Sequence, residues 1–291
     1  MAGGSWWLWN QAGRQSLAEP VVKVPGGHLW GAARHDASAS LYVPERGPAQ
    51  ATLAWTYADP AGLYPPVVAA DGALYAVSAQ DGGALLAFSP DGQLLWRAPI
   101  PDAVFRRVGD DFLRPQPDLP LSVPALSAAG EIIVAAGPGA VHAFAPAGHV
   151  RWTRPNPEPA DLLAQPLIGP DGTIYLATER HIIALAANGA GRWQINLPTY
   201  SYSQPILRLS ADGRFLSFQD YLLDAHTGAS LATAPVSLEM FIFGADGLVY
   251  LRKQAALEAW AVSDEAIQLP PRVPLDARGL GLDFSFPGDG G

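Results

Sequence analysis

Residues 171–193 read DGTIYLATERHIIALAANGAGRW, which contains an Asp-Gly turn, an apolar run, an Asn-Gly turn and a tryptophan. Glycine turns of the first kind recur along the chain, each followed three residues later by a large apolar side chain: Tyr75, Ile133, Tyr175, Leu216 and Tyr250. Self-similarity at about 40–45 residues, with four strands in each unit, is typical of propeller blades. We therefore predict an all-β fold, a β-propeller of four-stranded antiparallel blades.

A second glycine turn closes each unit, and in three of four copies a tryptophan follows it by four residues. These tryptophans are Trp96, Trp152 and Trp193, and the fourth copy has Ala232. Trp55 lies 41 residues before Trp96, the spacing that also separates Trp152 from Trp193. Large aromatic groups at equivalent outer-strand positions can bury much area and satisfy their single N–H. We predict that all four tryptophans pack between neighbouring blades and do not form a sugar-stacking ladder.

The units are spread evenly along the chain, with no linker-like segment between them. This pattern predicts a single propeller domain over residues 1–291. Five recognisable blades occupy residues 58–263, and residues 30–57 form a leader that ends in an outer strand.

Closure of the ring has two solutions. Leu53–Tyr57 reads as an outer strand with no inner strands ahead of it, so it could complete the unit at 238–263 and give five blades. Alternatively, segments 1–29 and 264–291 share a closing blade. We expect about six blades, with five to seven open.

Composition excludes several functional classes. Nucleic acid is not an expected partner, because 27 acidic and 18 basic residues give a net charge of −9. The absence of cysteine removes thiol catalysis, disulfides and cysteine-ligated zinc. No apolar run is long enough to span a membrane, and residues 1–10 do not read as a signal peptide. No histidine pair has helical metal-ligand spacing, so we predict no metal site.

The segment Pro101–Pro120 is the one long insertion between blades. It carries Arg106, Arg107 and Arg114 together with Phe112. Long loops on a rigid scaffold are often functional, and arginine and aromatic side chains are common anchors of binding surfaces. These four residues are therefore candidates for partner binding. The alternative is a solvated loop whose own aspartates pair with the arginines.

Three tyrosines lie in connections between an outer strand and the next inner strand. Such connections converge near the channel mouth of a propeller, so Tyr64, Tyr200 and Tyr202 are candidate residues for contacting a ligand or peptide. Packing across the edges of blades is the alternative for all three. A glycan-cleaving enzyme would need two carboxylates at a set separation, which the sequence alone does not place.

Several segments resemble the pyrroloquinoline-quinone-like β-propeller repeat family. The best copies are DGTIYLA at 171–177 and FSPDGQLLW at 88–96, and LDAHTG at 223–228 resembles the turn that docks tryptophans between neighbouring blades. Residues 30–57 resemble the leader before the first blade of many bacterial members. The resemblance covers about residues 30–263.

The resemblance implies two kinds of function. Some members of the family are quinoprotein dehydrogenases, with the quinone and a calcium ion on the channel axis, commonly beside a vicinal disulfide. Others bind no quinone and are assembly or interaction scaffolds of the cell envelope. Because this chain has no cysteine, we expect no cofactor, and pyrroloquinoline quinone and calcium are implied by the resemblance only.

We therefore expect a binding scaffold rather than an enzyme. Its top-face loops, led by 101–120, would meet a protein or polysaccharide partner, and the chain would be a monomer without a membrane span. By resemblance, the expected location is periplasmic, cell-surface or secreted, with the cytoplasm left open. A quinone-dependent dehydrogenase is the first alternative, and a glycan-cleaving enzyme is the second.

Overall fold

The computed structural model confirms the all-β fold class. Its described residues form twenty strands in five four-stranded antiparallel sheets, and the strands of each sheet follow chain order. The structure describes residues 28, 31–32, 53–79, 82–101, 123–136, 140–155, 162–178, 180–197, 206–218, 221–233, 241–243, 248–253, 256–262 and 267–268.

Each sheet is one blade, numbered here in chain order. Blade 1 consists of β1 (Val67–Val68), β2 (Leu74–Ser78), β3 (Ala84–Phe88) and β4 (Leu94–Pro99). Blade 2 consists of β5 (Ala125–Leu126), β6 (Ile132–Ala136), β7 (Ala140–Phe144) and β8 (Val150–Pro155). Blade 3 consists of β9 (Leu162–Ile168), β10 (Ile174–Thr178), β11 (His181–Leu185) and β12 (Gly191–Asn196).

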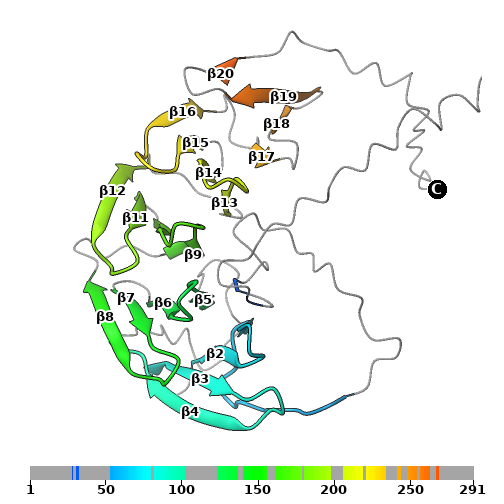
Figure 1. Cartoon of the computed structure of the whole chain (residues 1–291), viewed down its shortest axis with the longest axis vertical. Helices are drawn as coiled ribbons and strands as arrows, with labels where there is room; N and C mark the ends of the chain where they lie inside the picture. Colours follow the sequence, from blue (N-terminus) through cyan, green and yellow to red (C-terminus); the bar gives the residue numbers. More distant parts are fainter. Residues whose placement is uncertain are drawn as a thin grey trace, which may run out of the picture.

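Two further blades follow. Blade 4 consists of β13 (Leu207–Leu209), β14 (Phe215–Phe218), β15 (Tyr221–Asp224) and β16 (Ser230–Thr233). Blade 5 consists of β17 (Phe241–Phe243), β18 (Leu248–Lys253), β19 (Ala256–Val262) and β20 (Ile267–Gln268). The five blades lie along an arc, with the first strand of each blade toward the centre and the fourth toward the rim (Figure 1).

The turn between the first two strands shows how the sequence produces each blade. In blade 3, the N–H of Gly172 donates to the carbonyl of Gly169, and the Asp171 carboxylate accepts the N–H of Thr173 at 2.9 Å. Gly172 has a φ of +80°. This conformation is energetically unfavourable for a residue with a side chain but not for glycine. The Asp-Gly pair therefore reverses the chain after two residues, so that adjacent strands pair.

The fourth strand has the same irregular register in blades 1 to 4. Each tryptophan faces an alanine on the third strand, as in Ala184↔Trp193, and a register shift follows it. In blade 4 the larger side chain is on the third strand and the alanine on the fourth: Leu222 pairs with Ala232 before the same register shift. This bulge bends the outer strand at the point where the tryptophan is placed.

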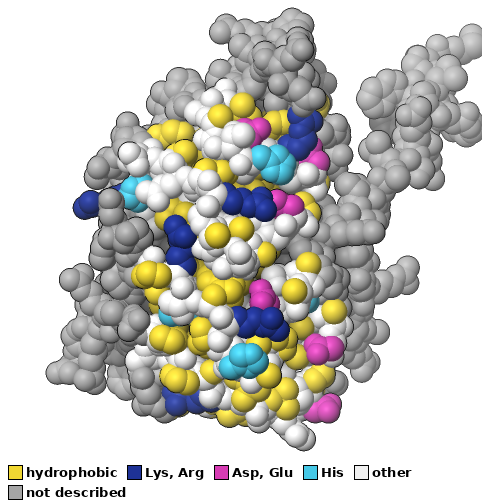
Figure 2. Space-filling model, turned by 60° about the vertical axis from the view of Figure 1, so that its left-hand side comes forward, with side chains coloured by type: hydrophobic (Ala, Val, Ile, Leu, Met, Phe, Trp, Pro, Cys, Tyr) yellow, Lys and Arg dark blue, Asp and Glu magenta, His cyan; other side chains and the backbone are white. Residues whose placement is uncertain are grey.

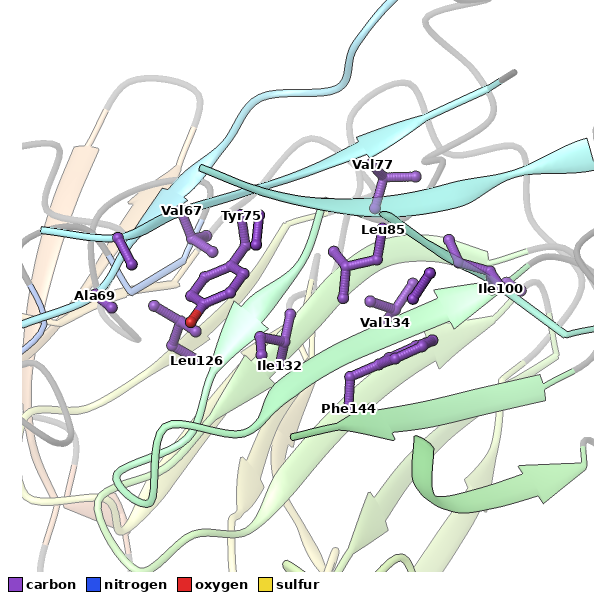
Figure 3. Packing of buried hydrophobic residues seen from close by; sticks show 14 residues of the cluster. Val67, Ala69, Tyr75, Val77, Leu85, Ile100, Leu126, Ile132, Val134 and Phe144 are labelled. Carbon is purple, nitrogen blue, oxygen red and sulfur yellow. The ribbon is translucent and has the colours of Figure 1, made fainter. Parts of the chain in front are cut away.

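The hydrophobic core lies between the faces of neighbouring blades. In blades 1 and 2 the third strands are buried along their whole length, whereas the fourth strands are largely exposed. Figure 3 shows Tyr75 and Leu85 of blade 1 packed toward Leu126, Ile132 and Phe144 of blade 2. Both faces of an inner strand therefore contribute to the core, which explains the continuous apolar runs in the sequence.

The fifth blade extends further than the sequence predicted. Its fourth strand is Ile267–Gln268 and not Leu53–Tyr57, so the blade extends beyond residue 263. A two-residue outer strand without a tryptophan gives almost no sequence signal. Leu53–Tyr57 instead lies against blade 1, where the rings of Trp55 and Tyr57 pack on Phe88 at centroid distances of 6.3 and 4.7 Å.

Candidate functional site

The four repeated tryptophans lie on the next blade along the chain. Each indole contacts the glycine of the turn between the third and fourth strands of that blade. The Nε1–H of each donates to a backbone carbonyl of the same turn: Trp55 to Pro90 at 3.1 Å, Trp96 to Pro146 at 2.9 Å, Trp152 to Ala187 at 3.1 Å and Trp193 to Ala225 at 3.0 Å. Trp96, Trp152 and Trp193 therefore hold neighbouring blades together, and Trp55 docks the segment before blade 1 onto that blade.

The contact between indole and glycine leaves no room for a side chain. A Cβ atom at Gly189 would lie 2.7 Å from Cε3 of Trp152, and one at Gly228 would lie 2.7 Å from the same atom of Trp193. Two separate constraints therefore require glycine at each of these turns: the positive φ and the close approach of the indole ring.

The turn carboxylates are likewise engaged locally. Asp171 accepts hydrogen bonds from the backbone N–H and the hydroxyl of Thr173, and its Oδ2 lies 2.8 Å from Nη1 of Arg192. Burial acts to raise the pKa of Asp171, but the bonds from Thr173 and Arg192 outweigh it and hold that pKa below its usual value. Asp224 is similar, since the bonds from Thr227 and His226 outweigh its burial and lower its pKa.

Of the candidate partner-binding residues, the structure describes Tyr64. Its side chain is half-buried and packs against the core between blades 1 and 2, and its N–H donates to the carbonyl of Val77 at 2.9 Å. Burial raises the pKa of its hydroxyl. Arg106, Arg107, Phe112, Arg114, Tyr200 and Tyr202 lie outside the described residues.

One buried contact had no clear signal in the sequence. His28 lies between the inner turns of blades 1 and 2, where its Nε2 is 2.7 Å from the carbonyl of Ser127 and its Nδ1 accepts the N–H of Ala70 at 3.3 Å. Beside it, the carbonyl of Gly31 accepts the N–H of Leu126 at 2.8 Å. The short segment drawn in dark blue, which holds residues 28, 31 and 32, lies near the centre of the arc (Figure 1). A lone histidine outside the repeats does not identify such a contact in advance.

Within the part of the chain that the structure describes, no group of three or more His, Asp or Glu residues could hold a metal ion. No helix among the same residues is long and apolar enough to cross a membrane.

Comparisons with known proteins agree with this architecture. A profile of the family described as outer membrane protein assembly factor BamB matches residues 26–268. A search of curated proteins finds no match.

Among 346 matching chains of solved structures are a catalytically inactive virginiamycin B lyase from Staphylococcus aureus, solved with quinupristin, and Hsv2 from Kluyveromyces lactis. The lyase is 15% identical with a TM-score of 0.49, and the match covers 73% of this chain and 71% of the lyase. For Hsv2 the identity is 11% and the TM-score 0.41, with 66% of this chain and 58% of Hsv2 covered. Likenesses of this degree carry no inference about activity.

Proposed function

The chain belongs to the PQQ-like β-propeller family described as outer membrane protein assembly factor BamB, and on that premise we propose that it is a non-catalytic scaffold that binds a protein partner in the cell envelope. The family name favours a protein over a polysaccharide, since an assembly factor acts on other proteins. In this proposal the loop at 101–120 binds the partner, with Arg106, Arg107, Arg114 and Phe112 as its anchors. Tyr64, Tyr200 and Tyr202 are further candidate contacts, in other connections between blades.

One observation carries the proposal: the repeated side chains that could take part in chemistry are used to build the blades. The indoles of Trp96 and Trp152 are held by turns of the next blade, and the carboxylate of Asp171 is held by its own turn and by Arg192. A rigid body whose polar and aromatic groups are engaged in this way is suited to presenting loops.

Site-specific photo-crosslinking tests the proposal. Benzoylphenylalanine replaces Phe112 in one protein and the exposed Leu231 of blade 4 in a matched control, and both proteins are irradiated with a cell-envelope extract of the native host. We expect one discrete protein adduct at position 112 and none at 231. Equal, heterogeneous labelling at both positions would refute a partner at this loop.

The same preparation tests the alternative enzyme. Addition of pyrroloquinoline quinone and calcium should leave the melting temperature unchanged, and no artificial dye should be reduced across a panel of alcohols and sugars. A thermal shift that needs both additives, together with dye reduction, would replace the scaffold by a quinone-dependent dehydrogenase.

A further inference from the structure

The inner ends of blades 1 and 2 are joined by a segment that precedes both blades in the chain. We call its described residues, His28, Gly31 and Ala32, the strap. The N–H of Leu126 donates to the carbonyl of Gly31 at 2.8 Å, and Ala32 forms a β-bridge. Leu126 belongs to β5, which is the first strand of blade 2 and lies toward the centre of the arc (Figure 1). The strap therefore covers part of the inner edge of blade 2.

The side chain of His28 connects the strap to both blades at once. Its Nε2 lies 2.7 Å from the carbonyl of Ser127, in the first turn of blade 2. Its Nδ1 accepts the N–H of Ala70, in the first turn of blade 1, at 3.3 Å. The residue is only 8% exposed. One buried imidazole ring thus bridges two turns that belong to different blades.

These two partners fix the protonation of the ring. A backbone N–H can only donate a hydrogen bond, and a backbone carbonyl can only accept one. Because Ala70 donates to Nδ1 of His28, that nitrogen carries no proton, and Nε2 carries the proton that is donated to Ser127. The bridge therefore requires the neutral imidazole. A second proton, on Nδ1, would face the N–H of Ala70 and break this bond, and it would place an unpaired charge in a buried site.

The charged groups of the surrounding turns already have partners in their own blades. Asp71 follows the blade 1 contact, and its Oδ1 accepts a backbone N–H of its own turn at 3.0 Å. Glu131 follows the blade 2 contact, and its Oε1 lies 3.4 Å from Nε of Arg151. Tyr75 of β2 points toward blade 2 (Figure 3) and stays neutral in acid, because burial and the charge of Asp71 raise its pKa. An acid that stabilised a charged His28 would have to leave its present partner.

We propose that the strap is a pH-sensitive fastener, which neutral His28 holds across blades 1 and 2 and which protonation of His28 releases. Histidine is the side chain whose charge ordinarily changes between about pH 5 and 8. The direction follows from the contacts: the strap is closed at neutral pH and open in acid, since only the neutral ring makes both bonds. Release would uncover the N–H of Leu126 on the inner edge of blade 2. This inference does not depend on a partner at the loop 101–120.

Amide hydrogen exchange tests the proposal, measured residue by residue by NMR at about pH 7.5 and about pH 5.5. Each rate is corrected for the intrinsic effect of pH on exchange. The amides of Ala70 and Leu126 report on the strap, because they donate to it. Their neighbours Ala69 and Ser127 donate within their own turns at 2.9 Å, so they are internal controls.

Three variants separate the charge of His28 from its hydrogen bonds. His28→Gln keeps one donor and one acceptor but gains no proton in this pH range, whereas His28→Phe removes both bonds. The matched control is His226→Gln, in an exposed turn between the third and fourth strands of blade 4. Figure 2, which brings the rim forward, shows histidine side chains exposed on this outer surface, in contrast to the buried ring of His28.

We expect the amides of Ala70 and Leu126 to exchange about tenfold faster at the lower pH, relative to the two control amides, in the native chain and in His226→Gln. In His28→Gln and His28→Phe this ratio should be the same at both pH values. If His28→Phe does not fold, His28→Gln against His226→Gln decides. Equal acceleration of all four amides would indicate a general opening of the blades and overturns the proposal. Unchanged protection in the native chain, or a pH dependence that persists in His28→Gln, overturns it as well.

The protonation of the ring is tested separately. Long-range nitrogen–proton correlation spectra at neutral pH should show one histidine with a protonated Nε2 and a bare Nδ1 whose signals are missing in His28→Gln. A His28 ring that carries its proton on Nδ1, or one that is already charged at neutral pH, would overturn the bridge on which the proposal rests.

Discussion

The docking of an indole on a turn glycine leads to a quantitative prediction at Gly189. Replacement by alanine has two costs. The first is the positive φ of +82°, which costs an alanine about 1 kcal/mol relative to glycine. The second is the new Cβ, which would lie 2.7 Å from Cε3 of Trp152 and must displace the ring. Displacement breaks the hydrogen bond from Nε1 to Ala187, worth about 1 kcal/mol, and loosens a similar amount of packing.

We therefore expect Gly189→Ala to lower the free energy of unfolding by about 3 kcal/mol. Gly62 provides the matched control. Its φ is +86°, but no atom lies within 4 Å of a Cβ at this position, so Gly62→Ala should cost only about 1 kcal/mol. Urea denaturation followed by tryptophan fluorescence measures both values.

A double-mutant cycle separates the two costs at Gly189. When Trp152 is also replaced by alanine, the obstructing ring is gone, and Gly189→Ala should then cost about 1 kcal/mol, as at Gly62. The reasoning is refuted if Gly189→Ala is no more destabilising than Gly62→Ala, or if its cost is the same with and without Trp152.

Three further predictions follow from the same contacts. Trp152→Phe keeps a ring on the turn but removes the Nε1–H, so the carbonyl of Ala187 loses its donor and stability should fall by about 1 kcal/mol in urea denaturation. Asp171→Asn should lower the free energy of unfolding by less than about 1 kcal/mol at pH 7, because the pair with Arg192 is partly exposed. Since the pKa of Asp171 is lowered in the folded state, this difference in stability from the native chain should vanish as the pH falls through and below 3.8. A difference that does not change with pH would contradict the assignment. The pKa of Tyr175 is raised to about 12, mainly by burial, so ultraviolet titration should show one tyrosine that ionises near pH 12 and is missing in Tyr175→Phe. The stability that its neutral hydroxyl supplies should be lost as the pH rises from about 10 to about 12.

The sequence predicted the blades because their signals are local. A glycine with positive φ, a large apolar residue three positions later and an outer tryptophan each act within one hairpin, as at Gly172, Tyr175 and Trp193. The family resemblance drawn from these copies is confirmed by the match over residues 26–268.

Contacts that depend on distant segments were harder to predict. The position of His28 between two inner turns depends on residues 42 and 99 positions away, and nothing near His28 in the sequence indicates them. Tyr64 contributes to the core between blades 1 and 2 because its connection folds back on β2, although its position in the repeat also fitted a channel-lining residue. The predicted loop at 101–120 stays a prediction.

The exchange of large and small side chains at Leu222 and Ala232 makes the junctions between neighbouring blades unequal in strength. Three successive junctions are fastened by an indole from the preceding sheet, whereas at the fourth the register places an alanine, which has no N–H to donate from its side chain. Among the described contacts, the fourth junction is the one without this hydrogen bond, so thermal opening should start there, where separation costs the least free energy. Under load or partial denaturation, the chain would part into a coherent larger body and a smaller end piece.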